Sequence, residues 1–246
     1  MTNKDQVLEE LGKTPYKTFR VFSPPKRGNR FLFNGGRGGL VVKILFVTDP
    51  HGEEPCIDYL KRLIKKHSPD AVLLGGDFER ASFATAMLEA CKVPAYAVHG
   101  NMDNQAVVDA LGERYLHEKT VKICSYVIGG LGGSNPTPFN TPMETTERKL
   151  AASLKKLGKT DVLLSHAPPF NTFADELPNE LHVGSKAVRG YLLKQKPLAC
   201  LCGHVHETQG VEKLGKTLVC KAAPLMQKTG FVLELPSLKG GVVNLD

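Results

Sequence analysis

The sequence predicts an α/β protein in which two mixed β-sheets are flanked by helices. Between residues 41 and 98, short apolar runs alternate with helix-like segments, which is the pattern of a parallel sheet with right-handed crossovers. Residues 115–131 and the strand candidates after residue 216 instead resemble antiparallel strands. At 246 residues, with 41% hydrophobic and 23% charged residues, the chain can bury a sizeable core as one large domain.

The parallel part of the fold follows from apolar runs that are bounded by turn residues. Residues 41–48 are nearly continuous apolar sequence before Asp49-Pro50, which indicates a central strand buried on both faces. Residues 54–67 carry apolar side chains at helical spacing with Lys and Arg between them, which predicts a surface helix. By the same criteria we expect strands at 71–74 and 95–98 and helices at 82–91 and 104–111.

The second half of the chain begins with the alternating stretch at 115–131, which stops at a glycine-rich break. We expect a helix to follow and to return the chain to another buried strand, with a proline-rich loop, a helix and a further strand after it. The predicted bounds are helix 143–157, strand 161–165, loop 167–183, helix 185–194, strand 198–202, and antiparallel strands at 217–221 and 230–235.

The positive charge of the chain is concentrated at its start. Residues 1–42 hold eight Lys or Arg and three Asp or Glu, a net charge of +5, whereas the whole chain carries +7. We predict a basic N-terminal extension over residues 1–42 and a compact domain over residues 43–246. The extension is interpreted as a solvated arm or an added edge hairpin; the alternative is a grip for nucleic acid, because it also contains four Phe. Within it we expect a short helix at 5–11, strands at 16–22 and 30–33, and a glycine linker at 35–39.

Polar residues follow five of the segments named above. Because the carboxyl ends of parallel strands meet in one crevice, side chains that are far apart in sequence can converge there. The convergent set would comprise two Asp, one Asn and four His, which is enough for two metal ions that share one carboxylate. The five segments are Asp49-Pro50-His51, Gly76-Asp77, Gly100-Asn101-Met102-Asp103, Ser165-His166 and Gly203-His204-Val205-His206.

In this order, the five motifs resemble those of the calcineurin-like metallophosphoesterases, across roughly residues 43–235. The resemblance implies a four-layer αββα sandwich with two metals at the sheet edges. It also implies the ligand sets: Asp49, His51, Asp77 and His206 for one metal, and Asp77, Asn101, His166 and His204 for the other. Asp77 would bridge the two metals, since a carboxylate has two charged oxygens that can span a gap of about 3.5–4 Å.

The implied reaction is hydrolysis of phosphodiester bonds in small substrates, with cyclic nucleotides as one class, by in-line attack of a metal-bridging hydroxide. Mixed imidazole and oxygen ligands suit Mn, Fe, Ni, Co or Zn and do not choose among them. Two alternatives stay open: a nuclease acting on single-stranded nucleic acid, and a non-catalytic scaffold of the same fold. The intact set of seven ligands argues against the scaffold.

The sequence departs from the family at Met102, where many members have a His thought to assist the leaving group. The resemblance is therefore to a subgroup of small phosphodiesterases with a Gly-Asn-x-Asp motif. Asn101 and His182 are the predicted catalytic and substrate-binding residues; for His182, the alternative is a capping or packing role. We interpret Asp103 as the N-cap of the helix after it, and His99 as a packing residue at a strand end.

Other features concern the protein's surroundings. The chain has no run of about 18 apolar residues and its first residues lack the apolar core of a signal peptide, so we expect a cytoplasmic protein with no membrane partner. Its six Cys lack the paired spacing of a zinc site and are expected to be reduced and mostly buried. The oligomeric state cannot be read from the sequence.

Overall fold

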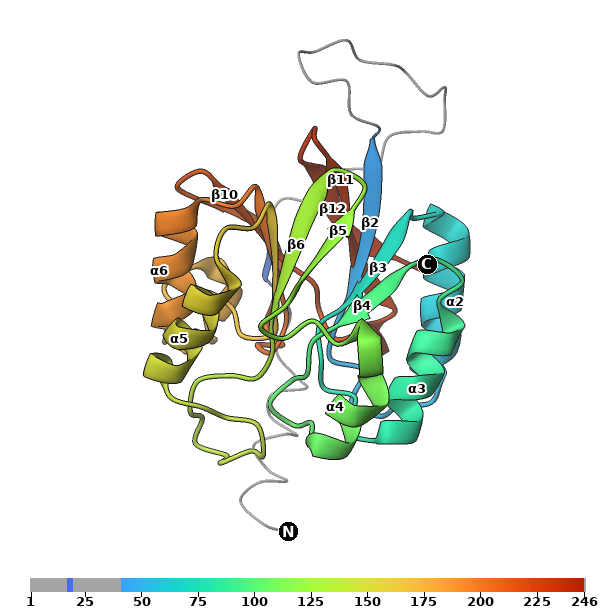
Figure 1. The fold of residues 1–246 in the computed structure, drawn as a ribbon, viewed down its shortest axis with the longest axis horizontal. Helices are drawn as coiled ribbons and strands as arrows, with labels where there is room; N and C mark the ends of the chain where they lie inside the picture. The colour runs from blue at the N-terminus through green and yellow to red at the C-terminus, as the bar shows by residue number, and fades with distance from the viewer. Residues whose placement is uncertain (1–16, 20–40, 246) are drawn as a thin grey trace.

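The computed structural model describes residues 17–19 and 41–245 of the chain. It shows two mixed β-sheets packed face to face, with helices on both outer sides (Figure 1). This is the predicted four-layer αββα sandwich. The predicted helix at 5–11, strand at 30–33 and linker at 35–39 lie outside the described residues.

The smaller sheet has five strands in the order β12-β11-β2-β3-β4. Its strands β2 (Val42–Val47), β3 (Ala71–Leu74) and β4 (Ala95–Ala97) are parallel, as their buried apolar sequences predict. Strand β11 (Thr229–Leu235) runs antiparallel to both β2 and β12 (Lys239–Asn244). Helices α2 (Pro55–His67), α3 (Ala81–Ala90) and α4 (Gln105–Leu111) lie along its outer side (Figure 1).

The larger sheet has seven strands in the order β1-β9-β10-β8-β7-β6-β5. Its centre, β6 to β8, is parallel, and β5 is antiparallel to β6. Helices α5 (Glu147–Leu157) and α6 (Lys186–Gln195) cover its outer side. The strands are β1 (Lys17–Phe19), β5 (Thr120–Ile123), β6 (Tyr126–Leu131), β7 (Val162–Ser165), β8 (Ala199–Cys202), β9 (Thr208–Leu214) and β10 (Thr217–Lys221).

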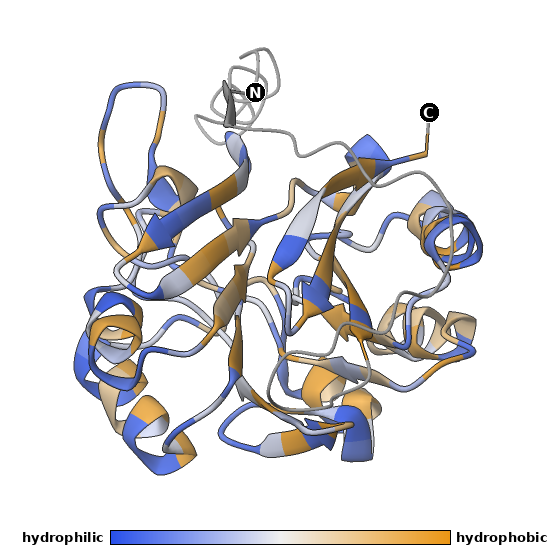
Figure 2. Ribbon diagram, turned by 90° about the horizontal axis from the view of Figure 1, so that it is seen from above, coloured by the Kyte–Doolittle hydropathy of each residue, from blue (hydrophilic) through white to orange (hydrophobic). Residues whose placement is uncertain are grey.

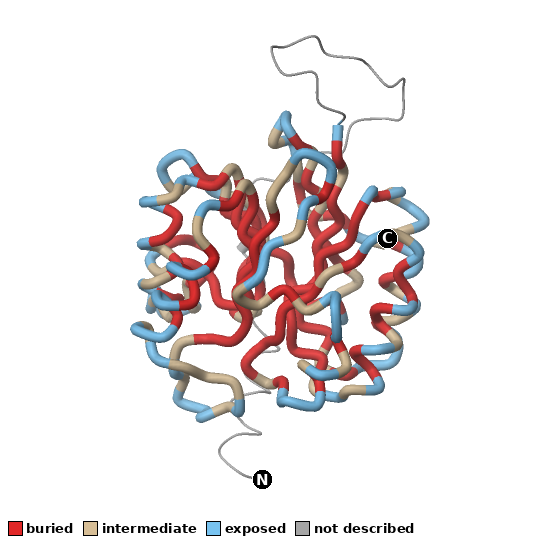
Figure 3. Tube along the Cα trace, in the orientation of Figure 1, coloured by how far each residue is buried: buried red, intermediate tan, exposed pale blue. Residues whose placement is uncertain are grey.

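Three apolar clusters occupy the three interfaces of the sandwich. One, around Leu45 and Phe83, lies between the smaller sheet and its helices, and another, around Leu154 and Leu192, joins the larger sheet to α5 and α6. The third, around Phe46, lies between the sheets, where both strand faces are apolar and buried (Figures 2 and 3). Because both sheets are rigidly packed, the carboxyl ends of their parallel strands lie at the same edge of the sandwich.

Some predictions of detail were wrong. Strand β10 is antiparallel to β9, as expected for the tail, but it also pairs parallel to β8. Helix α5 begins at Glu147 and not at residue 143, because Thr146 caps it by accepting the Lys149 N–H. The polar strands β9 and β12 were not predicted at all. Of the predicted strand at 16–22, the described part is β1, which pairs parallel with β9 at the sheet edge.

Two further expectations can be compared with the described residues. All six Cys are free, and every one except Cys124 is buried. No helix within residues 17–19 and 41–245 has both the length and the apolar character to cross a bilayer.

Candidate metal centre

The polar residues predicted to converge follow strands of both sheets. Asp49 and His51 follow β2, Asp77 follows β3 and Asn101 follows β4, while His166 follows β7 and the last two histidines follow β8. Direct contacts connect the two halves: the backbone N–H of His204 donates to both carboxylate oxygens of Asp49, at 3.2 and 3.0 Å. The site is therefore built across the interface between the sheets.

Four of the seven predicted ligands have left-handed backbone conformations. The φ angles are +52° at Asp49, +48° at His51, +60° at Asp77 and +72° at His204. A non-glycine residue in this region costs about 1–2 kcal/mol, so each turn needs support from its neighbours. The backbone N–H of His51 supplies part of it by donating to the Asp77 carbonyl at 2.9 Å. All four turns lie in the loops that follow β2, β3 and β8.

Two glycines allow the loops to approach closely. A Cβ at Gly100 would collide with the Asp77 carboxylate, and one at Gly203 would collide with Thr48 and Asp49. The glycines in the predicted motifs are thus needed for close approach of the ligand loops, which is a packing requirement and not a chemical one.

The first group of candidate ligands comprises Asp49, His51 and His206, whose ligand atoms all lie within 4.8 Å of one another. The His51 Nδ1 donates to a Glu79 oxygen at 3.0 Å. Burial acts to lower the pKa of His51, but the hydrogen bond to Glu79 and the nearby carboxylates outweigh it and raise this pKa to about 9. A metal ion bound at Nε2 would therefore have to displace a proton. That Nε2 atom lies only 3.2 Å from Nε2 of His206, which in turn is 3.8 Å from Asp49 Oδ1. The sequence analysis did not identify Glu79 as an orienting residue.

The second group comprises Asp49, Asp77 and His166, with Asn101 beside them. His166 Nδ1 donates to the Gly75 carbonyl at 2.8 Å, which leaves Nε2 facing the site. That Nε2 atom lies 2.8 Å from Asn101 Oδ1 and 3.6 Å from Asp77 Oδ2. One nitrogen and two oxygens thus meet in a buried place.

This donor set fits divalent metal ions. Two imidazole nitrogens at about 2.1 Å from one ion, with an angle near 90–110°, would lie roughly 3.0–3.4 Å apart, and the His51–His206 separation falls in that range. His166 Nε2 and Asn101 Oδ1, at 2.8 Å, are likewise close enough to contact one ion once Nε2 is unprotonated. Asp49 belongs to both groups, whereas the sequence analysis assigned the bridging role to Asp77.

The electrostatics of the site favour added positive charge. Burial raises the pKa of Asp77, and the neighbouring Asp49 carboxylate raises it further. Burial also acts to raise the pKa of Asp49, but contacts with His206 and His166 outweigh it and hold this pKa well below its usual range. Burial lowers the pKa of His204, so its ring is neutral and able to serve as a ligand.

Asp103 has a different role from the predicted one. The N-cap of α4 is Asn104, whose side chain accepts the Val107 N–H, and not Asp103. The buried Asp103 carboxylate instead accepts three backbone N–H groups from the ligand loops: Asp77 at 3.0 Å, Glu79 at 2.7 Å and Gly100 at 2.7 Å. It therefore joins the loop after β3 to the loop after β4, which sequence spacing alone could not reveal.

His182 lies outside the two ligand groups. Its Nδ1 atom lies 2.8 Å from Asp175 Oδ1, and its ring packs edge-on against Phe170. Asp175 is fully buried and also accepts backbone N–H groups from Asn171, Thr172 and Gly184. The ring is thus held by a fixed carboxylate, which the sequence analysis missed. Whether His182 contacts substrate remains a prediction.

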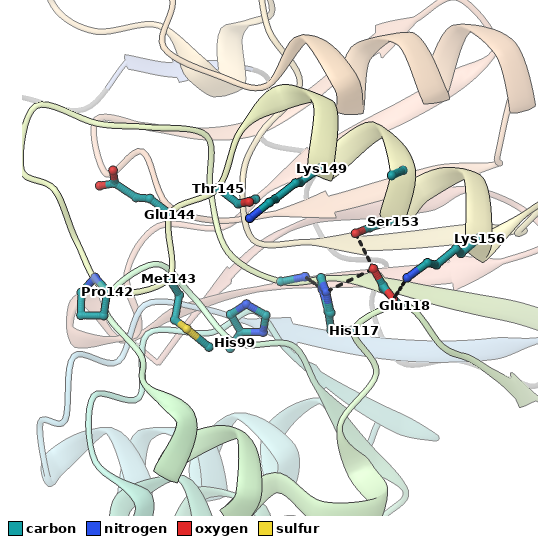
Figure 4. Close-up of a pocket in the computed structure, with 12 residues that line it drawn as sticks. His99, His117, Glu118, Pro142, Met143, Glu144, Thr145, Lys149, Ser153 and Lys156 are labelled. Atoms are coloured by element: carbon teal, nitrogen blue, oxygen red, sulfur yellow. Dashed lines mark hydrogen bonds and ion pairs between the residues drawn. The ribbon is translucent and has the colours of Figure 1, made fainter.

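His99 is a packing residue, as expected. Its ring fills the space beside Gly132 and lies 2.7 Å from the Tyr115 hydroxyl, and burial lowers its pKa to about 3. On its far side is a cavity of about 390 Å³ between α5 and residues 142–145 (Figure 4). Met143 and Glu144 form one wall of it, and Ser153 and Lys156 of α5 line the other.

The sequence of the folded domain identifies the family to which the chain belongs. The chain belongs to the calcineurin-like phosphoesterase family, whose sequence profile matches residues 42–208. Members of this family are metal-dependent hydrolases, and the two ligand groups described above are the candidate metal sites of this chain.

Several known proteins are similar to this chain. It is 35% identical over 209 residues to an uncharacterized protein of Methanocaldococcus jannaschii, MJ1162, and the match covers 78% of this chain and 92% of the relative. The solved structure of TT1561 of Thermus thermophilus has a TM-score of 0.67 at 18% identity, over 84% and 100% of the two chains. A novel archaeal phosphodiesterase has a TM-score of 0.51 at 16% identity, over 82% and 99%. These two structures show that the fold is shared.

Proposed function

We propose that the protein is a dinuclear metal-dependent phosphodiesterase that acts on small substrates, with cyclic nucleotides as one class. The observation that carries the proposal is the convergence of buried carboxylates and imidazoles from both sheets, in two groups whose ligand atoms all lie within 4.8 Å of one another. Mixed imidazole and carboxylate ligands at such separations suit a divalent cation. Family membership supports the hydrolytic chemistry.

Each of the seven predicted ligands has a place in this proposal. Asp49, His51, Asp77 and His206 would hold one ion, and Asp77, Asn101, His166 and His204 would hold the other, with Asp77 shared by both. When bound, two divalent ions orient a phosphoryl group, lower the pKa of a water molecule and neutralise developing charge. Asn101 adds an oxygen ligand without adding negative charge, which keeps the site attractive to a phosphate anion.

The protein's own side chains supply orientation and proton transfer. Glu79 and the Gly75 carbonyl accept from Nδ1 of His51 and His166, so in each ring Nε2 is the nitrogen available to a metal ion. Because Met102 cannot donate a proton, we assign contact with the leaving group to His182. Asp175 accepts the Nδ1–H of His182 and so directs its other nitrogen outward. The preference for diesters over monoesters rests on the subgroup resemblance.

The proposal can be tested by metal analysis paired with hydrolysis assays. Purified protein should contain two equivalents of divalent metal and should hydrolyse a bis-aryl phosphate faster than the matching aryl monoester. A panel of cyclic nucleotides and a single-stranded oligonucleotide would separate the small-substrate activity from a nuclease. Asp77→Ala should lose both metals and activity, while His206→Ala should lose mainly one metal.

A matched control is Asp58→Asn, since Asp58 is an exposed carboxylate of α2 that pairs with Arg62 one helical turn away. This variant should keep both metals and full activity, because exposed ion pairs of this kind contribute little. An Asp77→Ala protein that kept two equivalents of metal and full turnover would overturn the assigned site. A strong preference for monoesters in the parent protein would overturn the assigned substrate class.

A further inference from the structure

The orientation of the Asn101 amide is set by residues beyond the metal centre. Its Nδ2 atom donates to Thr141 Oγ1 at 2.9 Å, and the Thr141 hydroxyl donates in turn to Glu144 Oε1 at 2.6 Å. Since a hydroxyl has one hydrogen, Thr141 can only accept from Asn101 once it donates to Glu144. The Asn101 amide group is thereby turned away from His166, and Oδ1 is turned toward it.

The opposite orientation would turn the amide nitrogen toward the metal centre. An Asn101 amide rotated by half a turn would lose its acceptor at Thr141 and would present Nδ2, not Oδ1, to His166 Nε2. In the observed orientation Asn101 Oδ1 lies 2.8 Å from His166 Nε2. The Thr141–Glu144 pair is the group that holds the amide nitrogen on the other side.

Glu144 is well suited to anchor the pair. Its Oε1 atom also accepts the Thr137 hydroxyl and the Thr141 backbone N–H, the latter at 2.9 Å. Burial acts to raise the pKa of Glu144, but these hydrogen bonds outweigh it and lower the pKa to about 2. The carboxylate is thus ionised near neutral pH and acts only as an acceptor, which fixes the direction of every bond it receives.

The segment that carries this pair depends on hydrogen bonds for its position. On one side it borders the cavity of about 390 Å³ beside α5, so it lacks close packing there (Figure 4). On the other side the Met143 N–H donates to the Asn101 carbonyl at 3.0 Å, and the Thr145 N–H donates to Ser134. Main-chain and side-chain bonds from this one segment therefore both reach Asn101.

We propose that Thr141 and Glu144 are positioning residues that hold Asn101 in its metal-binding orientation. This inference rests on the metal centre proposed above. The pair has no direct contact with an ion in this arrangement; it acts by holding the Asn101 amide nitrogen away from His166, which leaves Oδ1 facing the site. Removing partners of this kind from metal ligands typically lowers metal affinity by about 10- to 100-fold.

The test compares Thr141→Val, which removes the hydroxyl and preserves the shape, with Thr141→Ser, which keeps the hydroxyl. Calorimetric titration with Mn²⁺ should show one metal equivalent of the Thr141→Val protein weakened by about 10- to 100-fold, with Thr141→Ser close to the parent. Glu144→Ala should reproduce the loss. Glu144→Gln should largely restore binding, because its amide oxygen can accept the same bonds.

Two further measurements keep the test specific. In Co²⁺-loaded protein, Thr141→Val should change the visible absorption spectrum, since one oxygen ligand is lost, whereas the melting temperature should stay within a few degrees. If the parent binds two ions and Thr141→Val binds both with parental affinity and spectrum, this inference is wrong while the metal centre stands. If the parent binds no divalent ion, the proposed function itself fails.

Discussion

The substitution Asp103→Ala is expected to destabilise the protein more than its place at the start of a helix suggests. The change removes the acceptor for three backbone N–H groups, those of Asp77, Glu79 and Gly100. A buried donor that loses its partner costs about 1–3 kcal/mol. The donors of Asp77 and Gly100 are buried, while that of Glu79 is partly exposed and can turn to water. The free energy of unfolding should therefore fall by about 2–6 kcal/mol, whereas the free energy of unfolding of a typical protein is about 5–15 kcal/mol in total.

Urea denaturation of the metal-free protein measures this loss directly. The control is Asn104→Ala, which removes the N-cap of α4 and should cost about 1 kcal/mol. Mn²⁺ titration provides a second readout: Asp103→Ala should weaken metal binding, because the loops that it releases carry Asp77 and Asn101, and Asn104→Ala should not. A loss below about 1 kcal/mol for Asp103→Ala, or equal losses for the two variants, would refute the assigned role.

Three further predictions concern other parts of the molecule. Met102→His, beside Asp77, should raise the cleavage rate of unactivated diesters relative to activated ones, because it adds a proton donor; an unchanged ratio in steady-state assays would count against this. Deleting residues 1–39 should leave metal content and small-diester turnover within a few-fold of the parent, since every proposed ligand lies at or beyond Asp49. A deletion of residues 1–16, which keeps β1, is the control. Loss of metal only in the longer deletion would show that β1 supports the site. Burial lowers the pKa of His117, so the folded protein favours the neutral ring. Because the unfolded chain then binds the proton more readily, the free energy of unfolding should fall as the pH drops below about 6.5. In urea titrations at several pH values, the free energy of unfolding of His117→Gln should fall less.

The parts of the fold that could be predicted are those where each strand is buried on both faces. Strands such as β2, β3 and β7 are short apolar runs that are followed by a ligand, and their bounds followed from the sequence to within a residue. The missed strands β9 and β12 are polar or glycine-rich, with mixed exposure, so composition gives little signal. Their pairing is decided by neighbouring strands that lie elsewhere in the sequence.

In the candidate site, too, some residues could be predicted from the sequence and others could not. The seven predicted ligands could be named because each stands at the end of an apolar run. The residues that orient them could not: Glu79 reaches His51 across 28 positions, and Asp103 reaches Asp77 across 26. Thr141 contacts Asn101 from a segment 40 residues away. Such contacts depend on how the loops fold back, which no local spacing records.

The left-handed turn at His204 places stability and activity in opposition. Glycine adopts this backbone angle without the steric cost borne by a side chain, so His204→Gly would relieve strain there. At Asp49 and Asp77 the same relief would be offset, because their carboxylates accept backbone N–H groups that glycine would leave unpaired. Selection for thermal stability alone, as in a directed-evolution experiment without an activity screen, would therefore remove His204 before the two Asp ligands while retaining the fold.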